Sequence, residues 1–219
     1  MFGSPCCCHG RRYGRAAKSP FIRLLHAVPN APAVDVYANE MLIARNLSYK
    51  DFTEYFAVPA SNYHIRVFPT GQKTNSLLTA NISVPAGSIF TAAAAGEAQN
   101  LSVVNISDRL MPLPPGKAYI KFVHLSPNAG SVDVTRPNGA KLFSGAEFKD
   151  ITNYTAVDPG VYTLQARTAG TDQVKLNVPN VNIRPDRFYT AYAVGVEGGD
   201  PPLQLLIALD GNSYISAAR

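Results

Sequence analysis

Three consecutive cysteines near the start of the chain, Cys6, Cys7 and Cys8, carry its most reactive side chains, and the sequence holds no other cysteine. Thiolates and the imidazole of the following His9 are zinc ligands, but four successive residues do not readily surround one ion tetrahedrally. Adjacent cysteines bond to each other only through a strained ring, and an odd number leaves a thiol for another molecule. The pattern therefore favours intermolecular disulfides over a metal site.

A histidine and an aspartate recur as a pair: His26 with Asp35, and His124 with Asp133, 98 positions further on. An imidazole near a carboxylate can act in a catalytic dyad, but neither copy shows a Ser or Cys nucleophile at a shared position. The alternative is structural, with the histidine bonding turn carbonyls and the aspartate accepting turn amides. We predict this turn-locking role for all four residues, and we expect no catalytic residue, metal or cofactor.

Both pairs belong to an internal repeat that covers most of the chain. The segment from Phe21 aligns with the segment from Tyr119 at an offset of 98, and YKDFTEYFAV aligns with FKDITNYTAV at an offset of 99. A near-constant offset indicates duplication, and copies of about 90 residues are large enough to hold separate cores. A proline-rich linker should hold the copies in a defined relation. We predict four parts: an arm (1–18), a first repeat (19–109), the linker (110–117) and a second repeat (118–219).

Within each repeat, apolar and polar side chains alternate, as in Val34-Asp35-Val36. A period of two is typical of half-buried strands, which we expect near residues 25, 35, 43, 55, 66, 80, 91 and 103 of the first copy. Thr91–Gly96 is too short and too closely flanked by strands to favour a helix. Asn138-Gly139 should supply the positive φ angles of a primed hairpin turn. The pattern predicts an all-β chain of two tandem sandwiches.

The positive charge of the chain is concentrated in the arm. Lys plus Arg number 20 against 15 Asp plus Glu, and four of the 20 precede Ser19, which leaves 16 basic against 15 acidic residues. This balance argues against a nucleic acid partner, because such proteins normally present a basic face. No apolar run approaches the roughly 20 residues that cross a bilayer, and the start lacks the apolar core of a secretory signal. We therefore expect neither membrane insertion nor a classical signal peptide.

The shared motif H-x-x-P-N-x-x-x-V-D-V, followed by K-D-[FI]-T-x-Y and a turn before Y-x-[IL], resembles a bacterial domain-of-unknown-function family, number 4397. The resemblance covers about residues 20–210 and implies small Ig-like or transthyretin-like β-sandwiches, often in tandem on secreted or surface proteins. It implies no catalytic residue, because the family has no established chemistry. The arm lies outside this resemblance and is flexible in composition. It is similar to the cysteine-bearing N-terminal connectors of spore-appendage subunits, which also lack signal peptides.

These features predict a non-enzymatic structural subunit that self-assembles into a fibre or layer on a bacterial surface, that of an endospore in our first interpretation. Its partners are further copies of the chain, joined as a homo-oligomer or polymer through the arm and cross-linked by the three cysteines. A cell-surface module that binds carbohydrate or protein through loops at the sandwich ends is the alternative. Polymer formation without any ligand would separate the two.

Overall fold

The computed structural model describes residues 19–97, 100–109 and 111–215. The strands of the first repeat are β1 (Phe21–His26), β2 (Val34–Ala38), β3 (Met41–Leu47), β4 (Phe56–Ala57), β5 (Ser61–Pro69), β6 (Leu78–Val84), β7 (Ile89–Glu97) and β8 (Asn100–Ser107). Those of the second are β9 (Ala118–His124), β10 (Val132–Thr135), β11 (Lys141–Ala146), β12 (Thr155–Val157), β13 (Gly160–Thr168), β14 (Val174–Ile183), β15 (Phe188–Val194) and β16 (Gln204–Leu209), followed by the 3₁₀ turn η1 (Gly211–Ser213). The all-β prediction is confirmed, with Thr91–Gly96 inside β7. Over the described ranges, no helix is long and apolar enough to cross a membrane.

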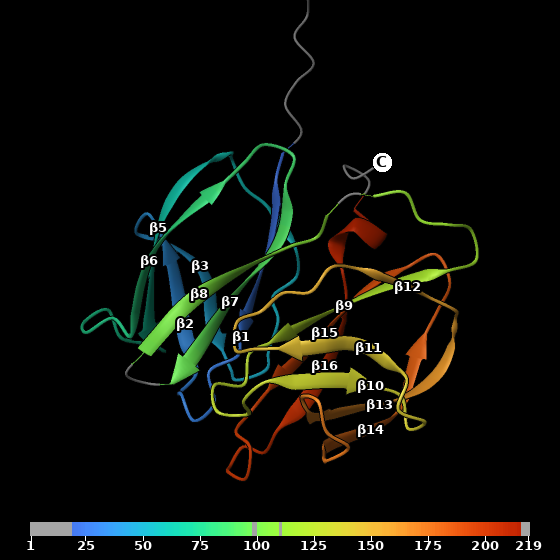
Figure 1. Cartoon of the computed structure of the whole chain (residues 1–219). Helices are drawn as coiled ribbons and strands as arrows, with labels where there is room; N and C mark the ends of the chain where they lie inside the picture. The colour runs from blue at the N-terminus through green and yellow to red at the C-terminus, as the bar shows by residue number, and fades with distance from the viewer. Residues whose placement is uncertain (1–18, 98–99, 110, 216–219) are drawn as a thin grey trace, which may run out of the picture.

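The strands pair into four sheets, and each sheet draws its strands from one repeat. The first repeat has the orders β4-β1-β7-β8 and β3-β2-β5-β6, and the second repeats them as β12-β9-β15-β16 and β11-β10-β13-β14. β1 pairs with β7, and β9 with β15, in parallel. Each repeat is thus a sandwich of two sheets. Figure 1 shows the two sandwiches side by side, blue to green and yellow to red.

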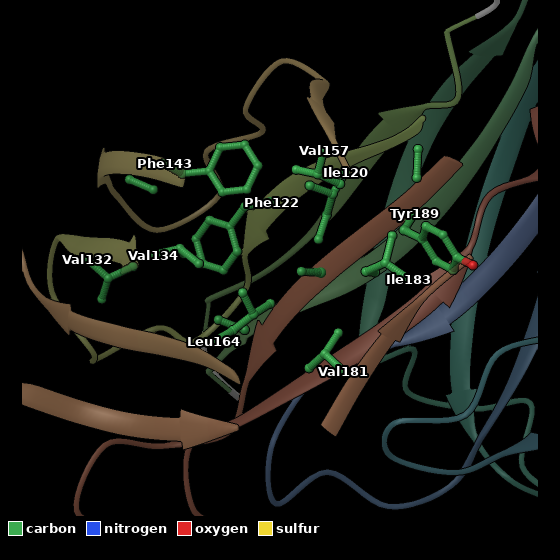
Figure 2. Close-up of a cluster of buried hydrophobic side chains, with 14 residues drawn as sticks. Ile120, Phe122, Val132, Val134, Phe143, Val157, Leu164, Val181, Ile183 and Tyr189 are labelled. Atoms are coloured by element: carbon green, nitrogen blue, oxygen red, sulfur yellow. The ribbon is translucent and has the colours of Figure 1, made fainter. Parts of the chain in front are cut away.

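Each sandwich encloses its own apolar core, because alternate side chains of both sheets point inward. In the second sandwich, Val132 and Val134 of β10 belong to one buried cluster with Ile120 and Phe122 of β9. Figure 2 shows these side chains meeting between the two sheets. The first sandwich has an equivalent cluster built from the corresponding strands.

A third apolar cluster joins the two sandwiches. Its members come from both repeats: Leu25, Ala27, Ala93, Ala95, Val104, Ile106, Val123, Leu125, Tyr192 and Val194. The sheets that contain β1 and β9, here called the inner sheets, therefore pack against each other as well as against their own outer sheets. As a result, β7, β9 and β15 are buried along nearly their whole length, and the alternation expected of a half-buried strand fails there.

The hairpin at Asn138-Gly139 differs from the prediction. Gly139 has a φ of 84°, but Asn138 is not among the residues with positive φ, and its Oδ1 instead accepts the amide of Ala140 at 3.1 Å. The turn with two positive φ angles lies in the first repeat, where Asn39 and Glu40 have φ values of 45° and 69° between β2 and β3. The Asn-Gly signal therefore marked a real turn but the wrong turn type.

Candidate functional site

The two predicted histidines lie at the ends of β1 and β9 and bond to the loops that follow. His26 Nε2 donates to the carbonyl oxygen of Pro32 at 3.1 Å, and the Val28 amide donates to His26 Nδ1 at 3.3 Å. His124 Nε2 donates to the carbonyl oxygen of Gly130 at 2.9 Å. Both rings are buried, and burial lowers the pKa of both histidines although the accepting carbonyls oppose it. A neutral ring thus ties each loop to its strand.

The first predicted aspartate connects two turns of the outer sheet. Asp35 Oδ1 accepts the Asn46 amide at 2.9 Å, and Oδ2 accepts the Gly71 amide at 3.0 Å. These two backbone bonds stabilise the carboxylate and lower the pKa of Asp35, the bond from Gly71 first. The side chain therefore fixes an irregular point of β3 to the loop after β5.

The second aspartate makes the same connection with one added charge. Asp133 accepts the amides of Gly145 at 2.7 Å and Gly170 at 3.0 Å, and Lys141 Nζ lies 2.7 Å from its Oδ2. The bond from Lys141 is the main cause that lowers the pKa of Asp133, followed among the favourable contacts by the two amides. The two copies thus share a backbone clamp.

The members of each predicted pair bond to different parts of the backbone. Each histidine bonds to a loop carbonyl and each aspartate to backbone amides, as set out above. Cys6, Cys7 and Cys8 lie outside the described residues. In the part of the chain that the structure describes, no group of three or more His, Cys, Asp or Glu side chains is placed to hold a metal ion.

A further set of polar side chains, which sequence reasoning missed, lies buried between the inner sheets. Arg23 of β1 donates through Nε and Nη2 to Thr91 Oγ1, at 3.1 and 3.0 Å. It crosses to the second repeat, where Nη1 donates to the carbonyl oxygen of Leu209 at 3.0 Å and Nη2 to the Tyr192 hydroxyl at 3.2 Å. Asp210 Oδ1 lies 3.7 Å from Nη2. Burial lowers the pKa of Arg23, but the nearby Tyr192 and the other acidic groups outweigh it, so the net pKa is raised.

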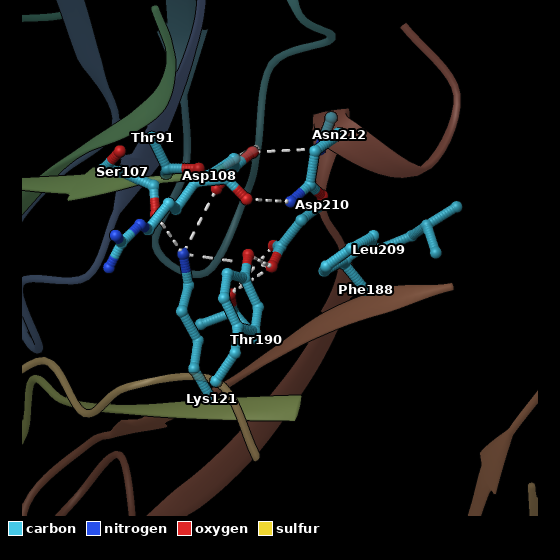
Figure 3. Close-up of polar contacts among 12 residues, drawn as sticks. Thr91, Ser107, Asp108, Lys121, Phe188, Thr190, Leu209, Asp210 and Asn212 are labelled. Carbon is cyan, nitrogen blue, oxygen red and sulfur yellow. Dashed lines mark hydrogen bonds and ion pairs between the residues drawn. The ribbon is translucent and has the colours of Figure 1, made fainter. Parts of the chain in front are cut away.

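Lys121 takes the equivalent position in β9 and crosses in the opposite direction, as Figure 3 shows. Its Nζ donates to the carbonyl oxygen of Ser107 at 2.6 Å and to Asp108 Oδ1 at 3.3 Å, and lies 3.9 Å from Asp210 Oδ2. The Lys121 side chain is 2% exposed. The ammonium group is therefore sealed between two carboxylates and a carbonyl.

The two carboxylates are each bonded by a tyrosine of their own repeat. Asp108 accepts the Tyr55 hydroxyl, and Asp210 accepts the hydroxyls of Tyr154 at 2.6 Å and Thr190 at 2.7 Å, all through Oδ2. Burial, followed by the nearby Asp108 charge, raises the pKa of Asp210 to about 6 although the lysine opposes this. Burial also raises the pKa of both tyrosines, so their hydroxyls stay protonated as donors.

These residues form what is here called the interface network: Arg23, Tyr55, Thr91 and Asp108 with their counterparts Lys121, Tyr154, Thr190 and Asp210. The contacts are reciprocal. The carbonyls of Leu209 and Ser107 bind the two cations, and these two residues pair with equivalent positions of β15 and β7. In the sequence, FIRLLH and YIKFVH each place one cation inside an apolar strand, a pattern that also fits a half-buried strand with one solvent-facing cation.

The interface network links the two sandwiches through buried contacts. The side chains of its ion pairs are at most 7% exposed, so a dissolved substrate does not reach them. Two cations and two carboxylates balance in charge. A buried ion pair of this kind is strongly destabilising when one partner is lost, because the other charge is left without compensation.

A cavity of about 400 Å³ is the other candidate site, and it lies between the two sheets of the first sandwich. Its inner wall is aliphatic and includes Leu24, Val36, Ile65, Val67 and Ala92. Pockets of roughly 300–1,000 Å³ with apolar walls are typical of small-molecule sites.

Comparisons with known proteins place the repeats in a family. The family model described as Domain of unknown function (DUF4397) matches residues 20–135 and 136–218. No curated protein matches the chain. Among solved structures, the Bacillus anthracis TIE protein is similar over 82% of this chain at 12% identity, with a TM-score of 0.27. The chain spans 34% of the length of that protein.

Proposed function

This chain belongs to the family described as Domain of unknown function (DUF4397), and we propose that it is a non-enzymatic structural subunit of a bacterial surface. The observation that carries the proposal is the interface between the inner sheets. A shared apolar cluster and a sealed, charge-balanced network join the sandwiches into one unit. Such a unit suits load-bearing assembly, whereas the recurring His and Asp residues bond to backbone groups and the ion pairs of the interface network are sealed from solvent.

In its finer form, the proposal makes the subunit a component of an endospore fibre or layer. Residues 1–18 would reach a neighbouring subunit, and Cys6, Cys7 and Cys8 would cross-link the contact. The support is in the sequence: the three cysteines of the chain are consecutive and stand in an arm that precedes the first repeat. An arm of this kind can contact a neighbour while the sandwiches keep their fold.

The test compares the full chain with a protein that lacks residues 1–18 and with a variant in which the three cysteines are serine. Negative-stain microscopy and light scattering under non-reducing conditions measure assembly. We expect long polymers from the full chain and folded, unassembled sandwiches from the truncated protein. The triple-serine variant should still assemble but should lose the ladder of cross-linked species on non-reducing gels and should resist detergent less.

Polymers of normal length from the truncated protein would contradict assembly through the arm. Absence of polymers from the full chain, with or without reductant, would contradict the structural function itself. Circular dichroism of all three proteins is the control, because each should retain the same β spectrum.

A second candidate function, that of a binding module, is favoured by one observation. The cavity of the first sandwich is large and apolar, and its lining includes exposed residues at one edge of the sandwich. The two functions are compatible, because the cavity and the interface between the inner sheets lie on different sides of the first inner sheet.

A further inference from the structure

The two repeats differ in side-chain size at two positions of this core: Leu24 lines the cavity, and Ala44 packs against the same core beside the lining residue Ile43. Leu24 in β1 stands where β9 has Phe122, 98 positions later. Ala44 in β3 has the register that Phe143 has in β11, each opposite the central valine of the neighbouring strand. The aspartate contacts support the alignment of Ala44 with Phe143. Asp35 accepts the amide two residues after Ala44, and Asp133 accepts the amide two residues after Phe143. Two aromatic rings in the second sandwich thus correspond to an aliphatic side chain and a methyl group in the first.

In the second sandwich, the two rings lie in the core between the sheets. Phe122 and Phe143 stack with 6.1 Å between ring centroids and 21° between ring planes, and both are buried. Figure 2 shows them between the two sheets, above Leu164. Protein interiors are normally packed to the density of organic crystals, and the second sandwich has two stacked rings in its core with the same strand order. The smaller side chains of the first sandwich therefore favour open space within the same fold.

The cavity reaches the surface between the edge strands β3 and β4. The lining residues that are also exposed are Asn39, Met41, Ala57 and Pro59, and Met41 is 70% exposed. β3 and β4 are edge strands of their sheets, and β4 is two residues long, so it covers little of this edge. In the second sandwich, Phe143 stands on the corresponding edge strand. The first sandwich thus has an entrance where the second has a buried ring.

The lining chemistry selects an aliphatic ligand. Among the described lining residues there is no Asp, Glu, Lys or Arg, so a charged group inside would lose its hydration without a partner. An apolar cavity of about 150 Å³ already binds benzene, and a void deprives its wall of dispersion contacts that a ligand restores. The space of about 400 Å³ between two sheets suits a longer, flexible chain.

We infer that this cavity binds one aliphatic chain, of a fatty acid or of a lipid, with the polar head left in water at the β3–β4 edge. The inference rests on the second of the two functions proposed above, and it names the ligand class and the site. The aliphatic chain is common to both sources, and the experiment distinguishes them.

The experiment uses the full chain and two probes. Hexadecanoic acid, below its micelle-forming concentration, is titrated by calorimetry and followed by native mass spectrometry. Vesicles of dioleoylphosphatidylcholine are tested by co-sedimentation and by extraction of the bound lipid. We expect one bound chain per protein. Binding of the free acid alone identifies a soluble fatty acid as the source, and recovery of phospholipid identifies a membrane lipid.

The second sandwich supplies the matched variant. Leu24→Phe with Ala44→Phe places in the first sandwich the two side chains that the second already holds, and should weaken binding at least tenfold without lowering the melting temperature. Ala44→Leu, a smaller change, should weaken binding measurably if the double variant does not fold. Adding Phe143→Ala to the Leu24→Phe/Ala44→Phe variant removes a ring from the core of the second sandwich and should restore binding of one aliphatic chain there.

Three results would overturn the inference. One is failure of both probes to bind the unaltered protein. Another is unchanged affinity for the bound probe in the Leu24→Phe/Ala44→Phe variant or in Ala44→Leu. The third is binding of naphthalene with no binding of hexadecanoic acid, which would assign the cavity to compact aromatic ligands. Polymer formation is measured separately. Failure to bind either probe therefore does not contradict the structural function, and failure to form polymers does not contradict ligand binding.

Discussion

Replacement of Lys121 by methionine tests whether the interface network holds the two sandwiches together. Methionine keeps most of the side-chain volume and removes the ammonium group. It leaves Asp108 and Asp210 with one cation, Arg23, and leaves the Ser107 carbonyl without its 2.6 Å donor. Because these side chains are at most 7% exposed, water does not replace the lost partner. We expect the free energy of unfolding at pH 8 to fall by about 3–5 kcal/mol, the usual cost of leaving a buried charge unpaired.

The cost should depend on pH in a direction that the structure fixes. The pKa of Asp210 is about 6 in the folded chain, above its ordinary value, so the folded state takes up a proton before the unfolded state as the pH falls. Loss of the ammonium raises this pKa further. At pH 5 the protonated Asp210 leaves Arg23 balanced by Asp108 in the variant. The penalty of Lys121→Met should therefore be full above the raised pKa of Asp210 in the variant, shrink as the pH falls from there to about 6, and stay reduced at pH 5.

Urea unfolding followed by circular dichroism at pH 8 and pH 5 measures these quantities. The double variant Lys121→Met/Asp210→Asn restores neutrality and should cost less than the sum of the single variants by roughly 1–3 kcal/mol. Lys117→Met is the control, because the Lys117–Asp158 ion pair is exposed and its loss should change stability little. Additive single costs, or a penalty for Lys121→Met that is the same at both pH values, would refute the reasoning.

Three other substitutions have expected outcomes of their own. His124→Gln should lower the free energy of unfolding by about 1–3 kcal/mol. Because burial lowers the pKa of His124, the parent protein should also lose stability as the pH falls below 6.5. The variant should lose less stability over that pH range. Asp133→Ala removes the acceptors of the Gly145 and Gly170 amides, and should speed hydrogen exchange at both in NMR spectra without unfolding the inner sheet. Phe143→Ala should cost about 3–5 kcal/mol in chemical denaturation, because it opens a cavity in a filled core; a cost near zero would mean that the ring is not needed for packing.

The strands and the duplication were predictable from the sequence, because alternation is a property of neighbouring residues and a constant offset appears when two segments are aligned. The predicted exposure was wrong for strand residues whose side chains contact the other repeat. Arg23 and Lys121 read as solvent-facing residues of half-buried strands, yet the face that they occupy packs against the other sandwich. Nothing local distinguishes a polar residue that faces water from one that faces a complementary charge.

The two candidate sites were hidden for different reasons. The interface network joins Asp108 to Gly211 across 103 positions at 2.9 Å, and no short-range signal predicts such a contact. The cavity lies between two sheets, and the correspondence of Ala44 in its core with Phe143 depends on register shifts in the β2–β3 and β10–β11 pairs. Turn chemistry gave a smaller error, since Asn138 keeps a negative φ by bonding its own loop.

The interface between the inner sheets has the symmetry of a homodimer inside one chain. Each copy contributes the same face, and the contact of Arg23 with the second repeat is returned by Lys121 with the first, as in an isologous contact about a twofold axis. Because both faces belong to one chain, this association does not depend on protein concentration. Two chains that exchange their second halves would form the same contacts. The face that joins the two sandwiches of one chain is thus also a face through which two chains can associate.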